Sequence, residues 1–177
     1  MNTFFISWVS GTWKSSLIPY LKDSLDKNKF SIYDFDERWV PDNVSHDWRL
    51  KETNYWLKVA IDNAKNNIST IICWISLPNE ITESTNSKSA PEQKICLLDI
   101  SDDAISNRLK WRYQTKKSIE ELKRAVWINV ETFIQENIKF AIALRWLFKK
   151  YNCEIINTSN DTIEESIKKV ITWINNS

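Results

Sequence analysis

Three residues near the N-terminus have the types and the spacing that bind a phosphate group. Gly11, Lys14 and Ser15 come shortly after the apolar run of residues 2–7. Where a strand turns into a helix, backbone N–H groups can surround phosphate oxygens, a lysine can reach the terminal phosphates, and a hydroxyl can bind magnesium. A helical pattern follows directly, so the positive end of that helix would face the same anion. We expect the phosphates to be bound by Ser10, Gly11, Thr12, Trp13, Lys14, Ser15 and Ser16.

Two tryptophans stand at positions where such a loop needs glycine. The pattern GxxxxGK[ST] has its two glycines where this chain has Trp8 and Trp13. Glycine suits both positions because the backbone must turn sharply and approach the phosphate closely, and an indole competes for that space. The alternative interpretation is therefore an ordinary strand-to-helix turn with an exposed Lys14.

Carboxylates and arginines farther along the chain are further candidates. Asp34 and Asp36 come at the end of the apolar run 30–35, and Arg108 and Arg112 are spaced i, i+4 on one face of an expected helix. Each pair also has an alternative interpretation in which it binds no ligand. The two aspartates can be solvated carboxylates that end a strand, and the two arginines can be solvated basic side chains.

Two more basic residues, Arg49 and Lys51, follow the acidic segment. They could contact an anionic substrate, but we favour a surface role for both. Trp48 and Trp56 fit the pattern of aromatic residues that pack a helix against a core.

Apolar runs and helical patterns alternate along the chain. Residues 69–75 form the strongest expected strand, apolar on both faces like a strand at the centre of a parallel sheet. Residues 78–92 are polar and bracketed by prolines, so we expect a mobile loop with room for one short helical turn. This alternation predicts βαβ units, and ligands of such sheets bind beyond the carboxyl ends of the strands. The other expected strands are residues 2–7, 30–35, 94–100 and 153–157, and the expected helices pass through Leu17, Leu21 and Leu25 and over 50–66, 101–112, 118–126, 129–150 and 163–174.

Together these features resemble the small P-loop kinases of the adenylate kinase, shikimate kinase and gluconokinase group. Residues 6–17 resemble the Walker A segment of these enzymes, and Asp34-Phe35-Asp36 resembles the DxD motif of shikimate kinase-like members. The resemblance implies an α/β, three-layer P-loop NTPase fold with a five-stranded parallel sheet in the order 2-3-1-4-5. It also implies a single domain over residues 1–177, with a short lid around residues 108–127.

The same resemblance implies a role for each residue of the site. Lys14 would hold the transferred phosphate, Ser15 and Asp34 would organise Mg²⁺, and Asp36 would position or deprotonate the acceptor hydroxyl. The remaining assignments are Arg108 and Arg112, which would close over the phosphates of ATP, and Thr158, which would lie beside the adenine.

The chain has one glycine and ten tryptophans. An average usage of about 7% predicts roughly 12 glycines in a chain of this length. We hypothesise that several tryptophan codons encode glycine biologically, as when an opal codon is read with the wrong genetic code. Genuine divergence into an inactive P-loop protein and deliberate substitution are the alternatives. The tryptophans at expected glycine positions are Trp8, Trp13, Trp39 and Trp74, with Trp111, Trp127 and Trp146 as further possible cases.

The composition of the chain argues against several other classes of protein. Lys and Arg number 24 against 23 Asp and Glu, so no global field attracts nucleic acid or an anionic membrane surface. The three cysteines lack the spacing of a zinc site, and His46 is the only histidine. No apolar run reaches 18 residues and the N-terminus lacks the basic region of a signal peptide, so we expect a cytoplasmic protein.

These observations favour an ATP-dependent kinase that uses Mg²⁺ and transfers the γ-phosphoryl group to a hydroxyl of a small molecule or nucleotide. The alternative is a non-catalytic binding module of the same fold, which becomes the better interpretation if Trp8 and Trp13 are real. Binding of nucleic acid is a distant third possibility, because it rests only on the basic lid and the tryptophans.

Overall fold

The computed structural model describes residues 1–12, 14–41 and 43–177 and shows five strands alternating with helices. The strands are β1 (Asn2–Trp8), β2 (Phe30–Asp34), β3 (Ser69–Cys73), β4 (Glu92–Asp99) and β5 (Glu154–Asn157). The helices are α1 (Lys14–Ser24), η1 (Phe35–Glu37, a 3-10 helix), α2 (His46–Ala64), α3 (Pro78–Glu83), α4 (Asp102–Arg112), α5 (Lys116–Val126), α6 (Val130–Lys150) and α7 (Ile163–Asn176).

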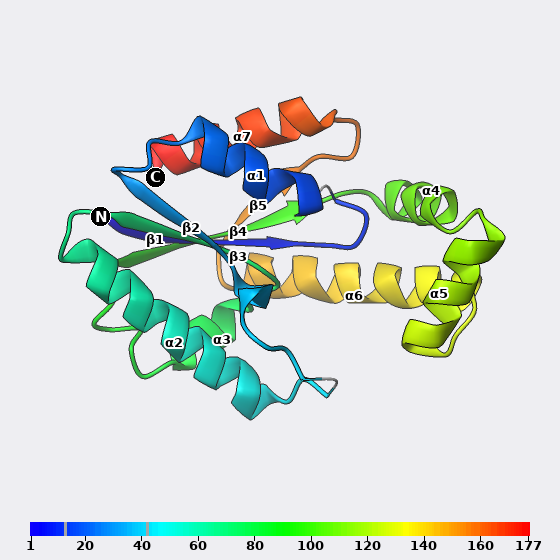
Figure 1. Cartoon of the computed structure of the whole chain (residues 1–177), viewed down its shortest axis with the longest axis horizontal. Helices are drawn as coiled ribbons and strands as arrows, with labels where there is room; N and C mark the ends of the chain where they lie inside the picture. The colour runs from blue at the N-terminus through cyan, green and yellow to red at the C-terminus, as the bar shows by residue number, and fades with distance from the viewer. Residues whose placement is uncertain (13, 42) are drawn as a thin grey trace.

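The five strands form one sheet in the order β2-β3-β1-β4-β5, and all four neighbouring pairs are parallel (Figure 1). This confirms the order and the fold class predicted from the sequence. Strand β1 lies at the centre, with Phe5 opposite Ile72 of β3 and Ile95 of β4. The carboxyl ends of β1, β3 and β4 therefore open onto the same edge of the sheet.

Burial follows the position of each strand in the sheet. Every residue of β3 is buried, as are Thr3 to Trp8 of β1, because both strands are covered on two faces. The edge strand β2 is only half-buried along its length, and two of the four residues of β5 are exposed. The unbroken apolar run at residues 71–75, within the expected strand 69–75, is the sequence signal of this central position.

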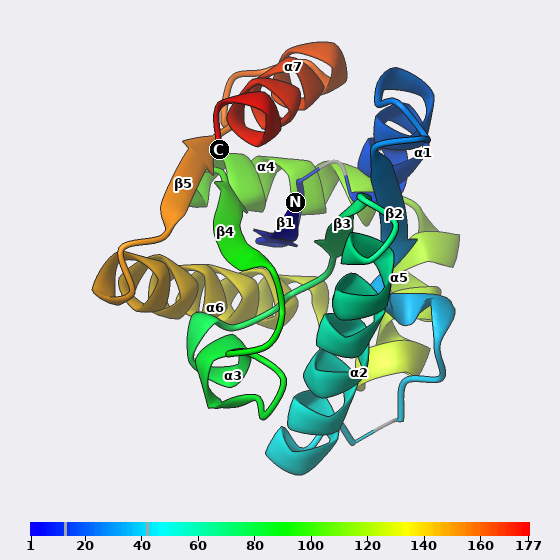
Figure 2. The same cartoon turned by 90° about the vertical axis from the view of Figure 1, so that its left-hand side faces the viewer.

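Helices cover the sheet on both faces, as Figures 1 and 2 show. Helices α1 and α7 lie side by side on one face, where Leu21 and Val170 are fully buried in the larger core. Helices α2, α3 and α6 lie on the opposite face. Helices α4 and α5 extend beyond the carboxyl ends of the strands, and Leu109 of α4 packs with Leu144 of α6 in a second core.

Side-chain caps fix where the helices begin. Ser101 Oγ accepts a hydrogen bond from the Ala104 amide at 3.2 Å and caps α4, which begins one residue inside the expected helix 101–112. Ser45 Oγ accepts one from the Trp48 amide at 3.2 Å, so α2 begins at His46 and not at the expected residue 50.

The polar segment that follows β3 also differs from expectation. It begins with the six-residue helix α3, which starts at Pro78, a residue pre-set for a first helical turn. Ile81 and Glu80 of this helix are buried at 1% and 2% exposure. The sequence allowed one short turn here, and these two buried side chains account for the longer helix.

Candidate phosphate-binding site

The turn between β1 and α1 contains the only glycine of the chain, and the backbone there requires it. Gly11 has φ +87°, a conformation that residues with a Cβ rarely adopt. A Cβ at this position would lie 3.2 Å from Cδ1 of Ile100 and 3.6 Å from Cβ of Arg108. The amide and hydroxyl of Thr12 both donate to the Val9 carbonyl, at 3.4 and 2.9 Å, and close the turn.

The predicted phosphate ligands are distributed around this turn. Lys14 and Ser15 open α1, and Ser16 follows in its first turn, so the backbone of the motif is at the N-terminus of a helix that follows a central strand. Trp13 lies outside the described residues, and so do the side chains of Lys14 and Ser15. The positive end of α1 and the sharp turn at Gly11 are the two features that favour binding of an anion here.

Trp8 occupies the first glycine position of the motif, and its side chain is buried in the core. It is the last residue of β1, it pairs with Leu98, and it is 6% exposed. Trp8 is one of the residues around a small hollow of about 190 Å³, whereas ligand pockets usually measure about 300–1,000 Å³. The hollow is lined by Trp8, Val9, Ser10, Gly11, Thr12, Ile75, Leu109, Arg112 and Phe133.

Helix α6 contacts the same turn through a residue that belongs to no motif of the sequence. Ser10 Oγ donates a hydrogen bond to Oδ1 of Asn137. The Nδ2 group of Asn137 in turn donates to the Phe133 carbonyl at 2.8 Å, which fixes the orientation of the amide. The loop is therefore held from a helix 127 residues away in sequence.

Arg108 of α4 ties the loop to the segment that follows β5. Its Nη1 donates to the Gly11 carbonyl at 3.1 Å, and its Nη2 donates to the carbonyls of Thr158 and Ser159 at 3.1 and 2.9 Å. Burial lowers the pKa of this guanidinium from its ordinary value. These contacts bring together three of the regions that the sequence predicts as parts of one site.

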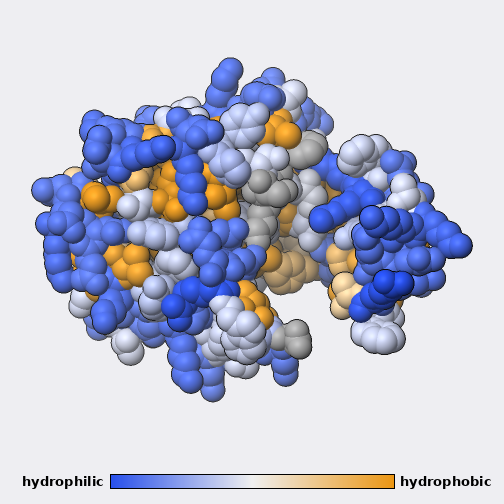
Figure 3. Space-filling view, in the orientation of Figure 1, coloured by the Kyte–Doolittle hydropathy of each residue, from blue (hydrophilic) through white to orange (hydrophobic). Residues whose placement is uncertain are grey.

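Arg112 and Thr158 take different positions at the same edge. Arg112 is exposed, lines the small hollow, and has its guanidinium carbon 5.6 Å from the ring centre of Tyr113. Thr158 is 1% exposed and its amide donates to the Asp99 carbonyl at 2.8 Å. Figure 3 shows that the arm formed by α4 and α5 is mostly hydrophilic on the viewed face.

The two aspartates of the DxD segment lie at the carboxyl end of β2. Asp34 Oδ1 accepts a hydrogen bond from the Asp36 amide at 3.1 Å and caps the 3-10 helix η1. Asp34 is half-buried and the side chain of Asp36 is exposed. Within the described residues no three His, Cys, Asp or Glu side chains gather closely enough to hold a metal ion by themselves.

Comparison with solved structures decides the class of fold. The chain matches an unliganded sugar kinase from Janibacter sp. HTCC2649 over 99% of its own length and 95% of the kinase, with a TM-score of 0.64 and 14% identity. It matches the shikimate kinase from Bacteroides thetaiotaomicron over 98% of each chain, with a TM-score of 0.53 and 16% identity. An uncharacterized protein from Eubacterium ventriosum ATCC 27560 matches over 99% of each chain, with a TM-score of 0.53 and 13% identity.

The chain has the fold of the small P-loop kinases. This confirms the resemblance to small P-loop kinases that the sequence motifs indicate. No protein-family profile and no curated protein sequence matches the chain, so the fold is supported by structure and not by sequence similarity.

Within this P-loop kinase fold, a buried ion pair supports the carboxyl end of β4. Arg145 of α6 donates through Nε to both carboxylate oxygens of Asp99 at 2.9 Å and through Nη2 to the Ile100 carbonyl at 2.6 Å. Burial raises the pKa of Asp99, and the hydrogen bonds from Arg145 oppose that rise. Sequence reasoning missed this pair, because an arginine in the middle of a long helix gives no sign of its distant partner.

A second cluster, of aromatic side chains, lies where β2 and β3 end. The ring of Phe35 stacks on the indole of Trp74, with ring centres 4.0 Å apart and an angle of 10°. The sequence assigned Arg49 to the surface, but its side chain is only 15% exposed and contacts this cluster. Arg49 is buried because Nε donates to Oε1 of Glu80, a carboxylate of α3, at 2.6 Å.

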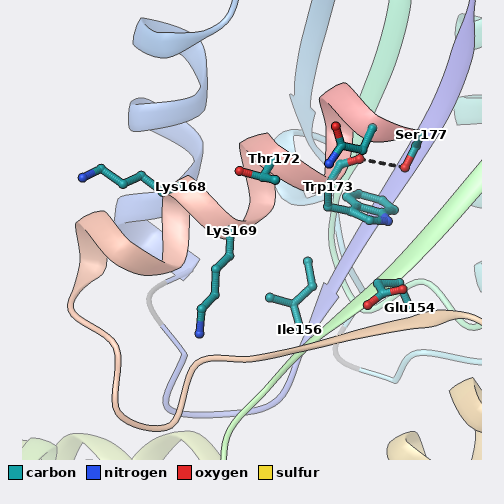
Figure 4. Close-up of a pocket in the computed structure, with 8 residues that line it drawn as sticks. Glu154, Ile156, Lys168, Lys169, Thr172, Trp173 and Ser177 are labelled. Carbon is teal, nitrogen blue, oxygen red and sulfur yellow. Dashed lines mark hydrogen bonds between the residues drawn. The ribbon is translucent and has the colours of Figure 1, made fainter.

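A hollow larger than the one beside Gly11 lies elsewhere, between β5 and α7 (Figure 4). It measures about 620 Å³ and is lined by Ile156, Trp173 and two lysines, Lys168 and Lys169. Lys169 Nζ points toward the loop before α7, where it donates to the Asn157 carbonyl at 2.8 Å. The groove runs along the outer edge of the sheet, away from the turn at Gly11. None of the described helices is long and apolar enough to cross a membrane.

Proposed function

We propose that this protein is an ATP-dependent kinase that transfers the γ-phosphoryl group to a hydroxyl of a small molecule or nucleotide. The turn at Gly11 carries the proposal, because it joins a central strand to the N-terminus of α1 with Lys14 and Ser15 in the first helical turn. The P-loop kinase fold supports the same conclusion. Residues 1–177 would act as one domain, with residues 108–127 as its lid.

The residues at the carboxyl edge of the sheet fit the proposed ligands. Hydroxyl and carboxylate oxygens are the ligands that Mg²⁺ prefers, and Ser15 and Asp34 would supply them. Bound Mg²⁺ would neutralise charge on the phosphates of ATP. Lys14 and the amides of the loop would bind the phosphates, and Asp36 would position the acceptor hydroxyl. Phosphoryl transfer depends mainly on such positioning and charge stabilisation.

The lid residues would complete this arrangement. Arg112, exposed beside the small hollow, would close over the phosphates. Arg108 already donates to the Gly11 carbonyl. It would also close over the phosphates, from the other end of the loop. Thr158 would lie beside the adenine.

A second function, a binding module without catalysis, is favoured by one specific observation. Trp8 is among the residues that line the hollow beside the loop, and that hollow is only about 190 Å³. If both tryptophans of the motif are present in the cellular protein, the space for a triphosphate is restricted. The fold would then serve to bind another molecule.

We further propose that some of the tryptophans are glycine in the protein that the cell makes. Trp127 supports this most strongly. It ends α5 with φ 59° and ψ 17°, the left-handed conformation in which glycine is the usual residue. Among the described residues the other non-glycine positions with positive φ are Asn67 and Asn152, and asparagine is the residue type that tolerates this region best. Trp127 is also 89% exposed, so its indole gains little from packing.

Two other exposed tryptophans lack this left-handed conformation. Trp39 is 77% exposed and follows η1, but its φ is not positive, so its backbone does not favour glycine as that of Trp127 does. Trp146 is 63% exposed but lies inside α6, where glycine would cost about 1 kcal/mol. We therefore do not include Trp146 among the proposed glycines. Intact-mass measurement of the protein from its native source tests the proposal, and a mass equal to that of the printed sequence would refute it.

Calorimetry with Mg-ATP separates the two functions. The kinase proposal predicts that the variant Trp8→Gly, Trp13→Gly binds Mg-ATP, whereas the printed sequence binds little. A matched control is Trp146→Gly in the printed sequence, which should bind no better than its parent. Absence of binding by the folded double variant would refute the kinase and favour the binding module.

A further inference from the structure

Strand β5 forms one outer edge of the sheet. It pairs with β4 and, among the described strands, with no other. Figure 2 shows this edge at the side of the molecule, between helices α6 and α7. The Thr158 amide donates to the Asp99 carbonyl of β4 at 2.8 Å, so alternation along the strand turns the backbone of Asn157 outward. Outward amides and carbonyls of this kind can pair with a further strand.

A groove accompanies this edge on the side of α7. Two hollows of about 620 and 280 Å³ adjoin there, since Glu154 and Trp173 line both of them. Ile156 and the Trp173 indole give the larger hollow apolar surface (Figure 4). The indole packs edge-on against Phe4, with ring centres 5.5 Å apart, so it is anchored to the core. We call the two hollows together the edge groove.

The charges of the edge groove lie at its opposite ends. Glu154 opens β5 and lies at one end, whereas Lys168 and Lys169 of α7 lie at the other (Figure 4). Lys169 Nζ donates to the Asn157 carbonyl at 2.8 Å, at the end of β5, and forms an ion pair with Asp161 at 2.6 Å. A surface that is acidic at one end and basic at the other is complementary to the same surface turned by 180°.

The opposite edge of the sheet, at β2, does not have this property. The hollow beside β2 measures about 220 Å³, and its charged lining residues are Lys22 and Lys27. Pairing two copies through β2 would bring these lysines toward one another, and like charges in an interface oppose binding. The distribution of charge therefore favours β5 over β2 as a self-pairing edge.

We propose that the edge groove binds a second copy of this chain, with the two β5 strands paired antiparallel about a twofold axis. The two five-stranded sheets then continue as one, and both α7 helices lie on the same face of it. Glu154 of each copy comes beside Lys169 of the other, so the contact forms two equivalent ion pairs. This inference is independent of the proposed kinase function, because the edge groove lies away from the turn at Gly11.

Sedimentation equilibrium of the printed sequence tests the proposal. We expect a concentration-dependent mass twice that of the chain. Glu154→Lys opposes two like charges at both ends of the contact and should weaken the dimer about tenfold or more. The matched control is Glu120→Lys, which makes the same change of charge at an exposed position of α5, away from β5 (Figure 1). It should leave the dimer unchanged.

Mixing two variants makes the test specific to this pair of residues. Lys169→Glu should weaken the dimer as Glu154→Lys does, because it opposes two carboxylates. An equal mixture of the two proteins should associate again. In the mixed dimer the two substituted side chains face each other with opposite charge, and so do the two original ones.

A further variant acts on the backbone of the edge. Asn157→Pro removes an outward amide and leaves the hydrogen bonds to β4 in place, so it should abolish the dimer while circular dichroism shows a folded protein. It also decides the question if Lys169→Glu does not fold, since that lysine contacts Asp161 as well.

Four results would overturn the proposal. One is a printed sequence that stays monomeric at every concentration measured. Another is a dimer that Glu154→Lys weakens no more than Glu120→Lys does. The third is a mixture of two folded variants that fails to associate, and the fourth is a dimer that survives Asn157→Pro.

Discussion

The guanidinium of Arg108 donates a hydrogen bond to the carbonyl of Gly11 across 97 residues of sequence, at 3.1 Å. The same side chain donates to the carbonyls of Thr158 and Ser159. Helix α4, at the base of the proposed lid, is therefore attached directly to the phosphate-binding turn. A change in the position of the lid would therefore also displace the turn.

Replacing Arg108 by alanine should destabilise the protein. The three carbonyls that it serves would lose a charged donor, which costs about 1–3 kcal/mol when the groups remain partly buried. Urea unfolding measures the loss. Lys110→Ala, an exposed basic residue of the same helix, is the control and should change stability little. Equal effects of the two substitutions would contradict the role given to Arg108.

Asn137 provides a second test of how the loop is held. In the Trp8→Gly, Trp13→Gly protein, Asn137→Ala should weaken Mg-ATP binding about fivefold, the equivalent of about 1 kcal/mol for one hydrogen bond. Lys139→Ala, on the same helix but exposed, should not weaken it. Unchanged affinity in the Asn137 variant would show that Ser10 keeps its place without this contact.

Trp127→Gly should raise the free energy of unfolding by about 1 kcal/mol, because glycine adopts the left-handed conformation without the penalty of a Cβ. The matched substitution Trp146→Gly should lower it by about 1 kcal/mol, because it places glycine inside a helix. Both indoles are exposed, so the difference between the variants isolates the backbone. If Trp127→Gly destabilises the protein as much as Trp146→Gly does, the position does not favour glycine.

The start of α7 predicts a pH dependence with a definite sign. The amide of Thr162 donates to Glu165 at 2.8 Å, and this hydrogen bond lowers the pKa of the Glu165 carboxyl. A carboxyl with a lowered folded-state pKa adds stability above its ordinary value of about 4.3, and that stability is lost as the pH falls through the folded-state pKa. Thermal unfolding of Glu165→Gln should therefore approach that of the parent at low pH. A constant difference between pH 7 and pH 3 would contradict this.

Much of the fold could be predicted because the chain alternates between two periodicities. The expected strand 69–75 includes the fully buried strand β3, residues 69–73, and the amphipathic pattern ending at Ile174 is α7. The ends of the helices were harder to predict. Helix α2 starts where the Ser45 side chain caps it and not where apolar residues begin.

Most of the contacts that shape the site could not be predicted from the sequence. Arg145 and Asp99 are 46 residues apart, and Ser10 and Asn137 are 127 apart, so no local spacing connects them. Arg49 looked like a surface residue because arginine side chains are mostly exposed in folded proteins. Only the packing of α2 against α3 places it beside Glu80 and Trp74.

In the proposed kinase, the turn at Gly11 binds the phosphates of ATP with the help of Lys14. The most direct measurement is the affinity for Mg-ATP of Trp8→Gly, Trp13→Gly with and without the added substitution Lys14→Ala. Loss of a charged hydrogen bond of about 1.5–3 kcal/mol predicts affinity weaker by about 10- to 150-fold in the triple variant. Equal affinities with and without Lys14, or no binding by the folded double variant, would contradict the account.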